Sequence, residues 1–240
     1  MVELNCQVER CCFTRDVSSF NHPDSVKTLV DVYKASINAN DKDGNNALHR
    51  AAHNGHVEVV KTLLLFDHCD VNAKGWRGRT ALHHACSEGH VCCIPELMAR
   101  GAQIKSRDSD TEETPLHLAA WFNHPDSVKT LVDVYKASII ATDKDGITSL
   151  RHSACIANTD VVGVLASNPH CDLTMRDSSG NTALHLAAYR GHTDVIRLLV
   201  SNPRCGVTIR TSDIITAAYI ARHLGHQDIV ALLELKTKNT

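Results

Sequence analysis

The chain repeats itself with a period of 34 residues. Gly44 and Gly78 stand 34 positions apart, and many other residue types recur at this spacing. The 17-residue segment FNHPDSVKTLVDVYKAS occurs twice without a change, at 20–36 and at 122–138, which is three periods along the chain. A fixed period of this size predicts a stacked repeat protein in which each unit packs mainly against its neighbours.

Two series of histidines follow the same period. The first series is His49, His83, His117 and His185, with Arg151 in the remaining place, and the second is His22, His56, His90, His124, His192 and His226. A zinc or catalytic site needs ligands that converge, whereas a periodic series is spread along the stack. We therefore interpret both series as recurring structural positions.

Each unit has the pattern of two short helices joined by a tight turn. In the segment GNTALHLAAYRGHTDVIRLLVSN, Thr182 is a suitable N-cap for the first helix. Gly191 is placed to end that helix, because glycine adopts the left-handed conformation at little cost. Apolar residues at helical spacing follow it, and in another unit Pro125 stands at the first position of the second helix.

These segments resemble ankyrin repeats. NTALHLAAYRGHTDVIRLLV, NNALHRAAHNGHVEVVKTLLL and RTALHHACSEGHVCCIPELM keep the recurring Leu-His, small pair, Gly-His and paired aliphatic residues in order, and the resemblance covers about Ser19 to Leu235. It implies an all-α ankyrin-repeat solenoid of helix-turn-helix units with short β-turn loops, about six to seven repeats in all. The expected segments are an N-terminal extension at 1–19 expected to be flexible, a partial N-terminal unit at 20–40, repeats at 41–74, 75–108, 109–142, 143–176 and 177–210, and a C-terminal capping repeat at 211–240.

The repeat at 143–176 departs most from the pattern. It has Arg151 in place of the histidine, Ala157 in place of the glycine, and Gly163 inside its second helix. A glycine in a helix interior costs about 1 kcal/mol relative to alanine. We expect this repeat to be the least stable part of the stack.

Composition excludes several classes of protein. The formal net charge is −2, and there is no basic patch of the kind that a nucleic-acid binder needs. The sequence has no run of about 18 apolar residues, so it does not predict a membrane-spanning helix. The start MVELNCQVERCC carries charges where a signal peptide has an apolar core, so we do not expect secretion. The ten cysteines then indicate free thiols in a reducing compartment. We expect the cytoplasm, with the nucleus as a second possibility.

The residues give little support for catalysis or for a metal. The chain has no C-x-x-C, no phosphate-binding glycine loop with a lysine, and no G-x-S-x-G or H-E-x-x-H. DKDG at 41–44 and 143–146 lacks the later ligands of a calcium loop. Cys69, Cys171 and Cys205 share one repeat position, which indicates a small buried residue, whereas oxidation or lipidation of Cys6, Cys11 and Cys12 remains an alternative. We expect no cofactor, no metal and no enzyme activity.

The resemblance implies that the functional residues lie on the surface of the stack. In ankyrin repeats the recurring histidines hydrogen-bond backbone groups, and the projecting turns and the inner helices form a concave face that binds proteins. Trp, Tyr and Arg often dominate binding at such surfaces. The residues that occupy this face by the resemblance are Trp76, Arg77, Arg79, Trp121, Phe122, Tyr189, Arg190, Lys42 and Lys144. The alternative for Trp121 and Phe122 is that they cover a neighbouring helix.

The sequence therefore predicts a monomeric, non-catalytic scaffold or adaptor that binds an unidentified partner protein. Two alternatives stay open. The chain could be an ankyrin fragment or a regulatory subunit of a larger enzyme, channel or phosphatase complex. It could also be a metal protein or an enzyme built on its histidines and cysteines.

Overall fold

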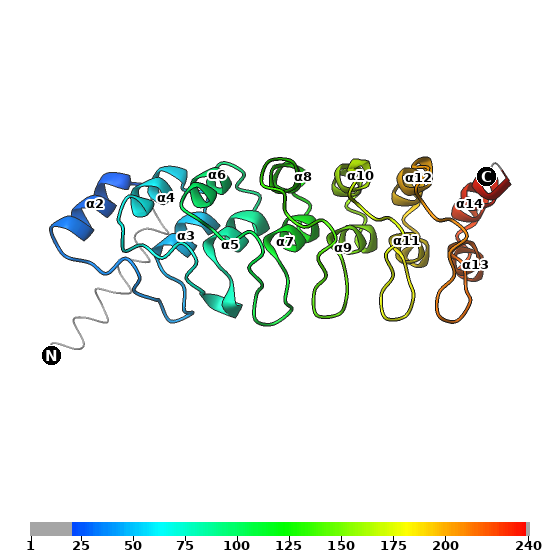
Figure 1. The fold of residues 1–240 in the computed structure, drawn as a ribbon, viewed down its shortest axis with the longest axis horizontal. Coiled ribbons are helices and arrows are strands. Elements are labelled where there is room, and N and C mark those ends of the chain that lie inside the picture. Colours follow the sequence, from blue (N-terminus) through cyan, green and yellow to red (C-terminus); the bar gives the residue numbers. More distant parts are fainter. Residues whose placement is uncertain (1–20, 239–240) are drawn as a thin grey trace. The chain divides into compact units, whose positions relative to one another are not determined.

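The computed structural model describes residues 21–238, and these residues form helices and short connecting turns (Figure 1). Among the described residues there is no β-strand, and two isolated bridges join Thr142 to Thr148 and Arg210 to Thr216. The expected all-α class is confirmed. The expected extension at 1–19 lies outside the described residues. The chain divides into two compact units, Met1–Pro115 and Leu116–Thr240, called here the N-terminal and the C-terminal unit.

In the N-terminal unit, short helices pack in two rows. The helices are α2 (Pro23–Asp31), α3 (Ala47–His53), α4 (Val57–Leu64), α5 (Ala81–Ser87) and α6 (Cys93–Ala99), with a 3-10 turn at Trp76–Gly78. Helices α3 and α5 lie side by side in one row, and α2, α4 and α6 form the other. The loops that lead into α3 and α5 project beyond the first row (Figure 1).

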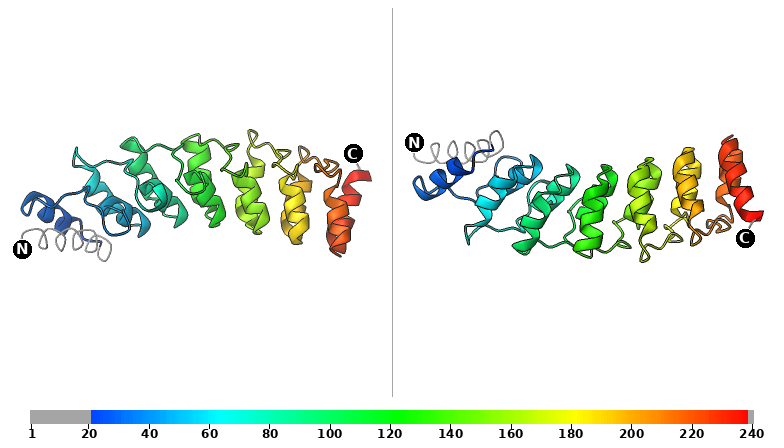
Figure 2. Two further views of the ribbon diagram at one scale, coloured as in Figure 1. Left: turned by 90° about the horizontal axis from the view of Figure 1, so that it is seen from below. Right: turned by 90° about the horizontal axis from the view of Figure 1, so that it is seen from above.

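The C-terminal unit continues the same helix-turn-helix order. It contains α7 (Pro115–Trp121), whose first residue closes the N-terminal unit, then α8 (Pro125–Lys129) with a π-helical turn at Thr130–Val134, α9 (Ser149–Cys155), α10 (Thr159–Ser167), α11 (Ala183–Arg190), α12 (Thr193–Ser201), α13 (Ala217–His223) and α14 (Gln227–Lys238). Helix α11 packs between α9 and α13, and α12 between α10 and α14. Figure 2 shows the successive helix pairs of this unit side by side.

Local sequence explains where these helices begin and end. Thr182 and His185 form a reciprocal capping box at the start of α11, and Gly191 ends that helix in the left-handed conformation with φ of 75°. The predicted caps are therefore confirmed. The N1 position predicted for Pro125 is also confirmed, at the start of α8.

The core of each unit lies between its two rows of helices. Leucine, isoleucine and valine side chains of the second helices meet alanine and leucine side chains of the first helices, and few of these atoms contact water. The fully buried members include Leu48, Leu63, Leu82, Ile94 and Leu97 in the N-terminal unit, and Leu131, Leu165, Val162 and Ile196 in the C-terminal unit.

The duplicated 17-residue segment is buried to different extents in its two copies. Its helix is α2 in the first copy, where Ser25 is exposed and Leu29 is half-buried. In the second copy Ser127 and Leu131 are both completely buried. Identical local sequence therefore makes a helix in both places but contributes unequal burial.

The difference in burial predicts that the same leucine-to-alanine substitution lowers the free energy of unfolding by different amounts in the two copies. Leu131→Ala should lower the free energy of unfolding by about 2–5 kcal/mol, the usual cost of deleting a fully buried leucine side chain. Leu29→Ala should cost clearly less, because part of the Leu29 side chain already contacts water. Urea unfolding of both variants measures this, and equal losses would show that the two copies are packed alike.

The repeat at 143–176 carries three unfavourable features. Arg151 is 1 % exposed, and its Nε atom has no hydrogen-bond partner. Its Nη1 donates to the carbonyl of Gly146, and its Nη2 lies 3.5 Å from Oδ2 of Asp177. Ala157 is held at φ of 62°, a conformation that costs a residue with a Cβ about 1–2 kcal/mol. Gly163 lies inside α10. These observations support the prediction that the repeat is the least stable, which hydrogen exchange would test directly.

Gly163→Ala should stabilise the C-terminal unit by about 1 kcal/mol. A Cβ at this position would meet no atom within 4 Å, and alanine loses less backbone entropy than glycine in a helix. The matched control is Gly191→Ala, which should destabilise, because φ is 75° and a Cβ there would lie 2.8 Å from the ring of His226. Urea unfolding and slower hydrogen exchange in α10 measure the gain. A loss of stability at Gly163 would mean that the helix interior is not open there.

Candidate protein-binding face

Each of several projecting turns is built around one aspartate. Asp41 accepts hydrogen bonds at Oδ1 from the N–H groups of Asp43 and Asn45, both 2.9 Å, and this fixes the turn before α3. Its second oxygen, Oδ2, accepts from Arg50 at 2.6 Å. The turn carboxylate therefore has two functions, one for each oxygen: it shapes the loop and it holds a cationic side chain of the following helix.

Three histidines of the first series, His49, His83 and His117, join their own turn to the turn that follows. The Nδ1 atom of His83 accepts from the N–H of Thr80 at 3.1 Å, and Nε2–H donates to the carbonyl of Glu113 at 3.2 Å. His49 makes the corresponding contacts, with Nε2 2.9 Å from the carbonyl of Ala73. In the C-terminal unit, Nε2 of His117 donates to the carbonyl of Ile147. The capping box of Thr182 holds Nδ1 of His185 in the same way.

The second series precedes or caps the second helices. His56, His124 and His192 are the N-caps of α4, α8 and α12, and His226 lies directly before α14. The Nε2 atom of His90 donates to the carbonyl of His53 at 2.9 Å, and that of His192 to the carbonyl of Cys155 at 2.9 Å. Gly55 lies beneath the ring of His90, where a Cβ would come within 2.5 Å of it. This close approach accounts for the recurring Gly-His pairs.

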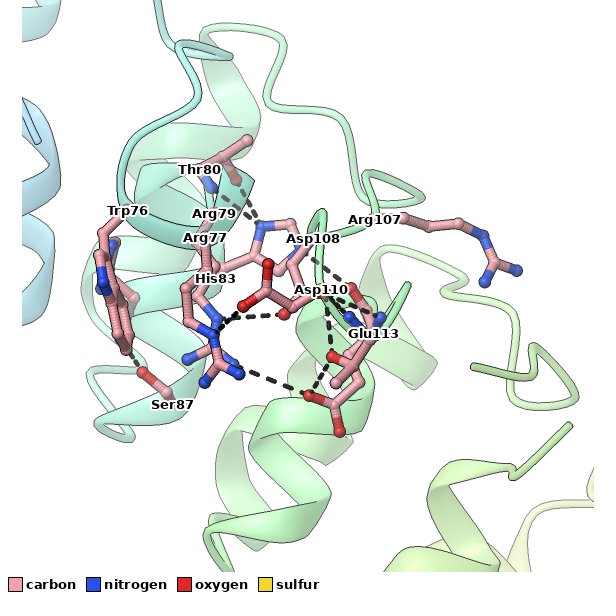
Figure 3. Close-up of polar contacts among 12 residues, drawn as sticks. Trp76, Arg77, Arg79, Thr80, His83, Ser87, Arg107, Asp108, Asp110 and Glu113 are labelled. Atoms are coloured by element: carbon pink, nitrogen blue, oxygen red, sulfur yellow. Dashed lines mark hydrogen bonds and ion pairs between the residues drawn. The ribbon is translucent and has the colours of Figure 1, made fainter. Parts of the chain in front are cut away.

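One predicted binding residue is buried, and the structure corrects that expectation. Arg79 is 9 % exposed. Its Nε donates to Oδ2 of Asp108 at 3.3 Å, and its Nη2 lies 3.7 Å from Oε2 of Glu113 (Figure 3). Asp108 in turn organises the next turn by accepting from the N–H of Thr111. Arg79 therefore ties two turns together and presents little surface to a partner.

Trp76 and Arg77 are exposed at the tip of the neighbouring turn. The Trp76 side chain is 49 % exposed, and the Arg77 guanidinium carbon lies 5.1 Å from its ring centroid while the group pairs with Asp110. The Trp76 N–H donates to Oδ1 of Asn45 at 3.0 Å, so the backbone beneath the indole is anchored to the preceding turn. Lys42 is exposed on that preceding turn.

A cavity of about 320 Å³ opens beside Trp76. We call it the His84 cavity; its lining residues are Asp43, Asn45, His49, Arg50, His53, Trp76, Arg79 and His84. The ring of His84 meets those of His49 and His53 edge to face, with centroids 5.7 Å apart in both pairs. Sequence reasoning missed His84 and Arg50 as site residues. The signal was present, since both directly follow a histidine of the first series.

The remaining predicted residues lie in the C-terminal unit. Trp121 and Phe122, at the end of α7, are 42 % and 49 % exposed, and the Trp121 ring meets that of His152 edge to face at 5.2 Å. Trp121 therefore both covers a neighbouring side chain and presents surface. Tyr189 is 59 % exposed with Arg190 beside its ring, and Lys144 is exposed in the turn before α9.

Comparison with protein families agrees with this architecture. The family model for ankyrin repeats matches the chain in three copies, at residues 15–108, 105–177 and 152–239. The chain belongs to the ankyrin-repeat family. None of the curated proteins compared with it gives a significant match. Ankyrin repeats generally mediate protein–protein interaction, and the family is generally non-catalytic.

No helix within residues 21–238 combines the length and the apolar character needed to cross a bilayer.

The ankyrin histidines of the first series are held in the neutral form. Burial lowers the pKa of His83 to about 4, and burial together with the neighbouring His152 lowers the pKa of His117 to about 4. Burial also lowers the pKa of His49 and of His185. A proton on Nδ1 of His83 would remove the acceptor that Thr80 uses, so geometry and burial favour the same protonation state.

The ankyrin stack should therefore lose stability as the pH falls from about 6.5 to 5. Well above pH 6.5 these histidines are neutral in both states. As the pH falls through 6.5 the unfolded chain takes up protons that the folded chain excludes, which costs about 2 kcal/mol by pH 5 for each of His83 and His117. The urea midpoint at several pH values measures this, and His83→Gln should reduce the proton uptake on unfolding by about one. A midpoint that does not change over this range would contradict buried neutral histidines.

Proposed function

We propose that the chain is a non-catalytic scaffold that binds a partner protein through the turns and first helices of its ankyrin repeats. The observation that carries the proposal is the exposure of the Trp76 side chain on a turn whose backbone is fixed. The indole is half-exposed, whereas the backbone beneath it is fixed by the hydrogen bond to Asn45. A large aromatic side chain on a rigid turn gives contact area at a small cost in ordering entropy, and Trp is among the residues that most often dominate binding.

The surroundings of Trp76 support the same role. Arg77 is partly exposed beside the ring, and the His84 cavity lies next to it. In the C-terminal unit, Trp121, Phe122 and Tyr189 are exposed at the ends of first helices. Exposed aromatic side chains are among the residues that most often dominate binding, so their presence on the turns and first helices of each unit supports the same role.

The cysteines are consistent with structural thiols in a reducing compartment. On this proposal the chain acts in the cytoplasm or the nucleus, and it acts as a monomer. Burial raises the pKa of Cys171 and of Cys205 to about 11, so both are protonated at neutral pH and are poor nucleophiles or metal ligands. This supports a non-catalytic role for the cysteines that share this repeat position.

The test compares Trp76→Ala with a matched change elsewhere on the N-terminal unit. Partners are captured by cross-linking in cells with the unaltered chain, and binding is then measured with the purified partner. Trp76→Ala should weaken binding by about tenfold or more, as expected for an aromatic anchor. The control is Leu65→Ala, at the end of α4, which is 68 % exposed and lies in the other row of helices.

Both variants should melt close to the unaltered chain, which separates a lost contact from lost folding. If the control weakens binding as much as Trp76→Ala does, the binding surface is the second-helix row and the proposed face is wrong. If neither variant changes the affinity, Trp76 is not an anchor.

A further inference from the structure

The turn aspartates provide an internal template for how this chain holds a carboxylate. The Oδ2 atom of Asp41 accepts from Arg50, and in the C-terminal unit Oδ2 of Asp143 accepts from Nε2–H of His152 at 2.9 Å. Arg50 and His152 occupy the same place in their repeats, nine residues after the aspartate. In both repeats a carboxylate of the turn accepts a hydrogen bond from a basic or titratable side chain on the first helix.

His84 occupies this place in its own repeat but has no such partner. The residue nine positions before it is Gly75, which offers no side chain. The Nε2 atom of His84, equivalent to the atom that binds Asp143 in His152, is buried and makes no hydrogen bond, and the residue is only 9 % exposed. A buried polar atom without a partner costs about 1–3 kcal/mol.

Packing explains why Gly75 cannot simply be an aspartate. A Cβ on Gly75 would lie 2.4 Å from Oδ1 of Asn45 and 3.1 Å from the ring of His49. Asn45 uses that oxygen to anchor the Trp76 turn. The same close packing that positions Trp76 therefore removes the carboxylate that His84 would otherwise receive from its own turn.

Basic side chains outnumber acidic ones among the residues that line the His84 cavity. The lining residues include two arginines, three histidines and one acid, Asp43. Both arginines already have carboxylate partners, Arg50 in Asp41 and Asp43 and Arg79 in Asp108, so the group without a partner is the imidazole of His84. Burial, together with the neighbouring His49, His53, Arg79 and His83, lowers the pKa of His84 to about 3. A carboxylate in the cavity would reverse that balance of charge at the imidazole.

We propose that the His84 cavity receives an acidic side chain, an aspartate, of the partner protein. Its carboxylate takes the place that Asp143 has beside His152, and accepts a hydrogen bond from the His84 imidazole. Trp76, half-exposed at the rim, covers the stem of the incoming side chain. The proposal rests on the proposed function, because it names the chemistry that the same face recognises.

The experiment uses the intact chain with nitrogen-labelled histidine and needs no partner. Blocked aspartate, N-acetyl-aspartate amide, is titrated at constant ionic strength and pH, and the imidazole nitrogens are followed by NMR. We expect a saturable shift of the His84 nitrogens with half-saturation between about 1 and 100 mM, since one side chain supplies few contacts. His152, which already holds Asp143, should not respond, and serves as the control within each spectrum.

Two further arms test charge and position. Blocked asparagine has the same shape without the charge and should give no saturable shift. His84→Leu should fold, because leucine occupies this place at Leu118 and Leu186, and it should remove the spectral response of the neighbouring His49 and His53 to blocked aspartate. With the captured partner, it should weaken binding by about tenfold.

The outcomes separate this inference from the proposed function. An absent response to blocked aspartate, or an equal response to blocked asparagine, would overturn the carboxylate site while leaving Trp76 as an anchor. A response to N-acetylglycine, which carries a free carboxyl terminus, without one to blocked aspartate would overturn the aspartate in favour of a chain end. A uniform shift of all histidines would mean general screening and would overturn the site.

Discussion

A buried neutral imidazole that bridges two turns is the interaction on which the rest of this structure depends. His83 accepts from Thr80 with one nitrogen and donates to the carbonyl of Glu113 with the other. A single tautomer thus caps its own helix and ties it to the next turn. Few side chains can accept on one side and donate on the other in so small a volume. Arg151, in the same place, can only donate, and its Nε atom has no hydrogen-bond partner.

The same bridges make the turn that carries Trp76 rigid. His49 donates from Nε2 to the carbonyl of Arg79 at 3.1 Å, and Asn45 accepts from the backbone of Trp76. The backbone around Trp76 is therefore held by two residues of the preceding repeat, although the indole itself stays exposed. Binding through such a turn does not require the loop to be ordered first. The imidazole of His49 therefore helps to determine where the exposed aromatic side chain lies.

Much of the fold could be predicted from the sequence, because the constraints that produce it are local and periodic. Thr182 and Gly191 begin and end α11 as expected, and the histidine series follow the repeat. Exposure in the turns could not be predicted in the same way. Arg77 and Arg79 are two residues apart, yet only Arg79 is buried, because Asp108 and Glu113 of the following turn lie beside it. That proximity depends on how one repeat stacks on the next, which no short motif encodes.

The duplicated segment also shows that local sequence does not determine burial. Both copies form a helix from the proline onward, since the local signals are identical. Leu131 is nevertheless completely buried while Leu29 is not, and the two sites differ in what surrounds them. The second copy directly follows helix α7, whereas within the described residues no helix precedes α2. The sequence of a repeat therefore specifies its helices, but the free energy that those helices contribute is set by the neighbours against which they pack.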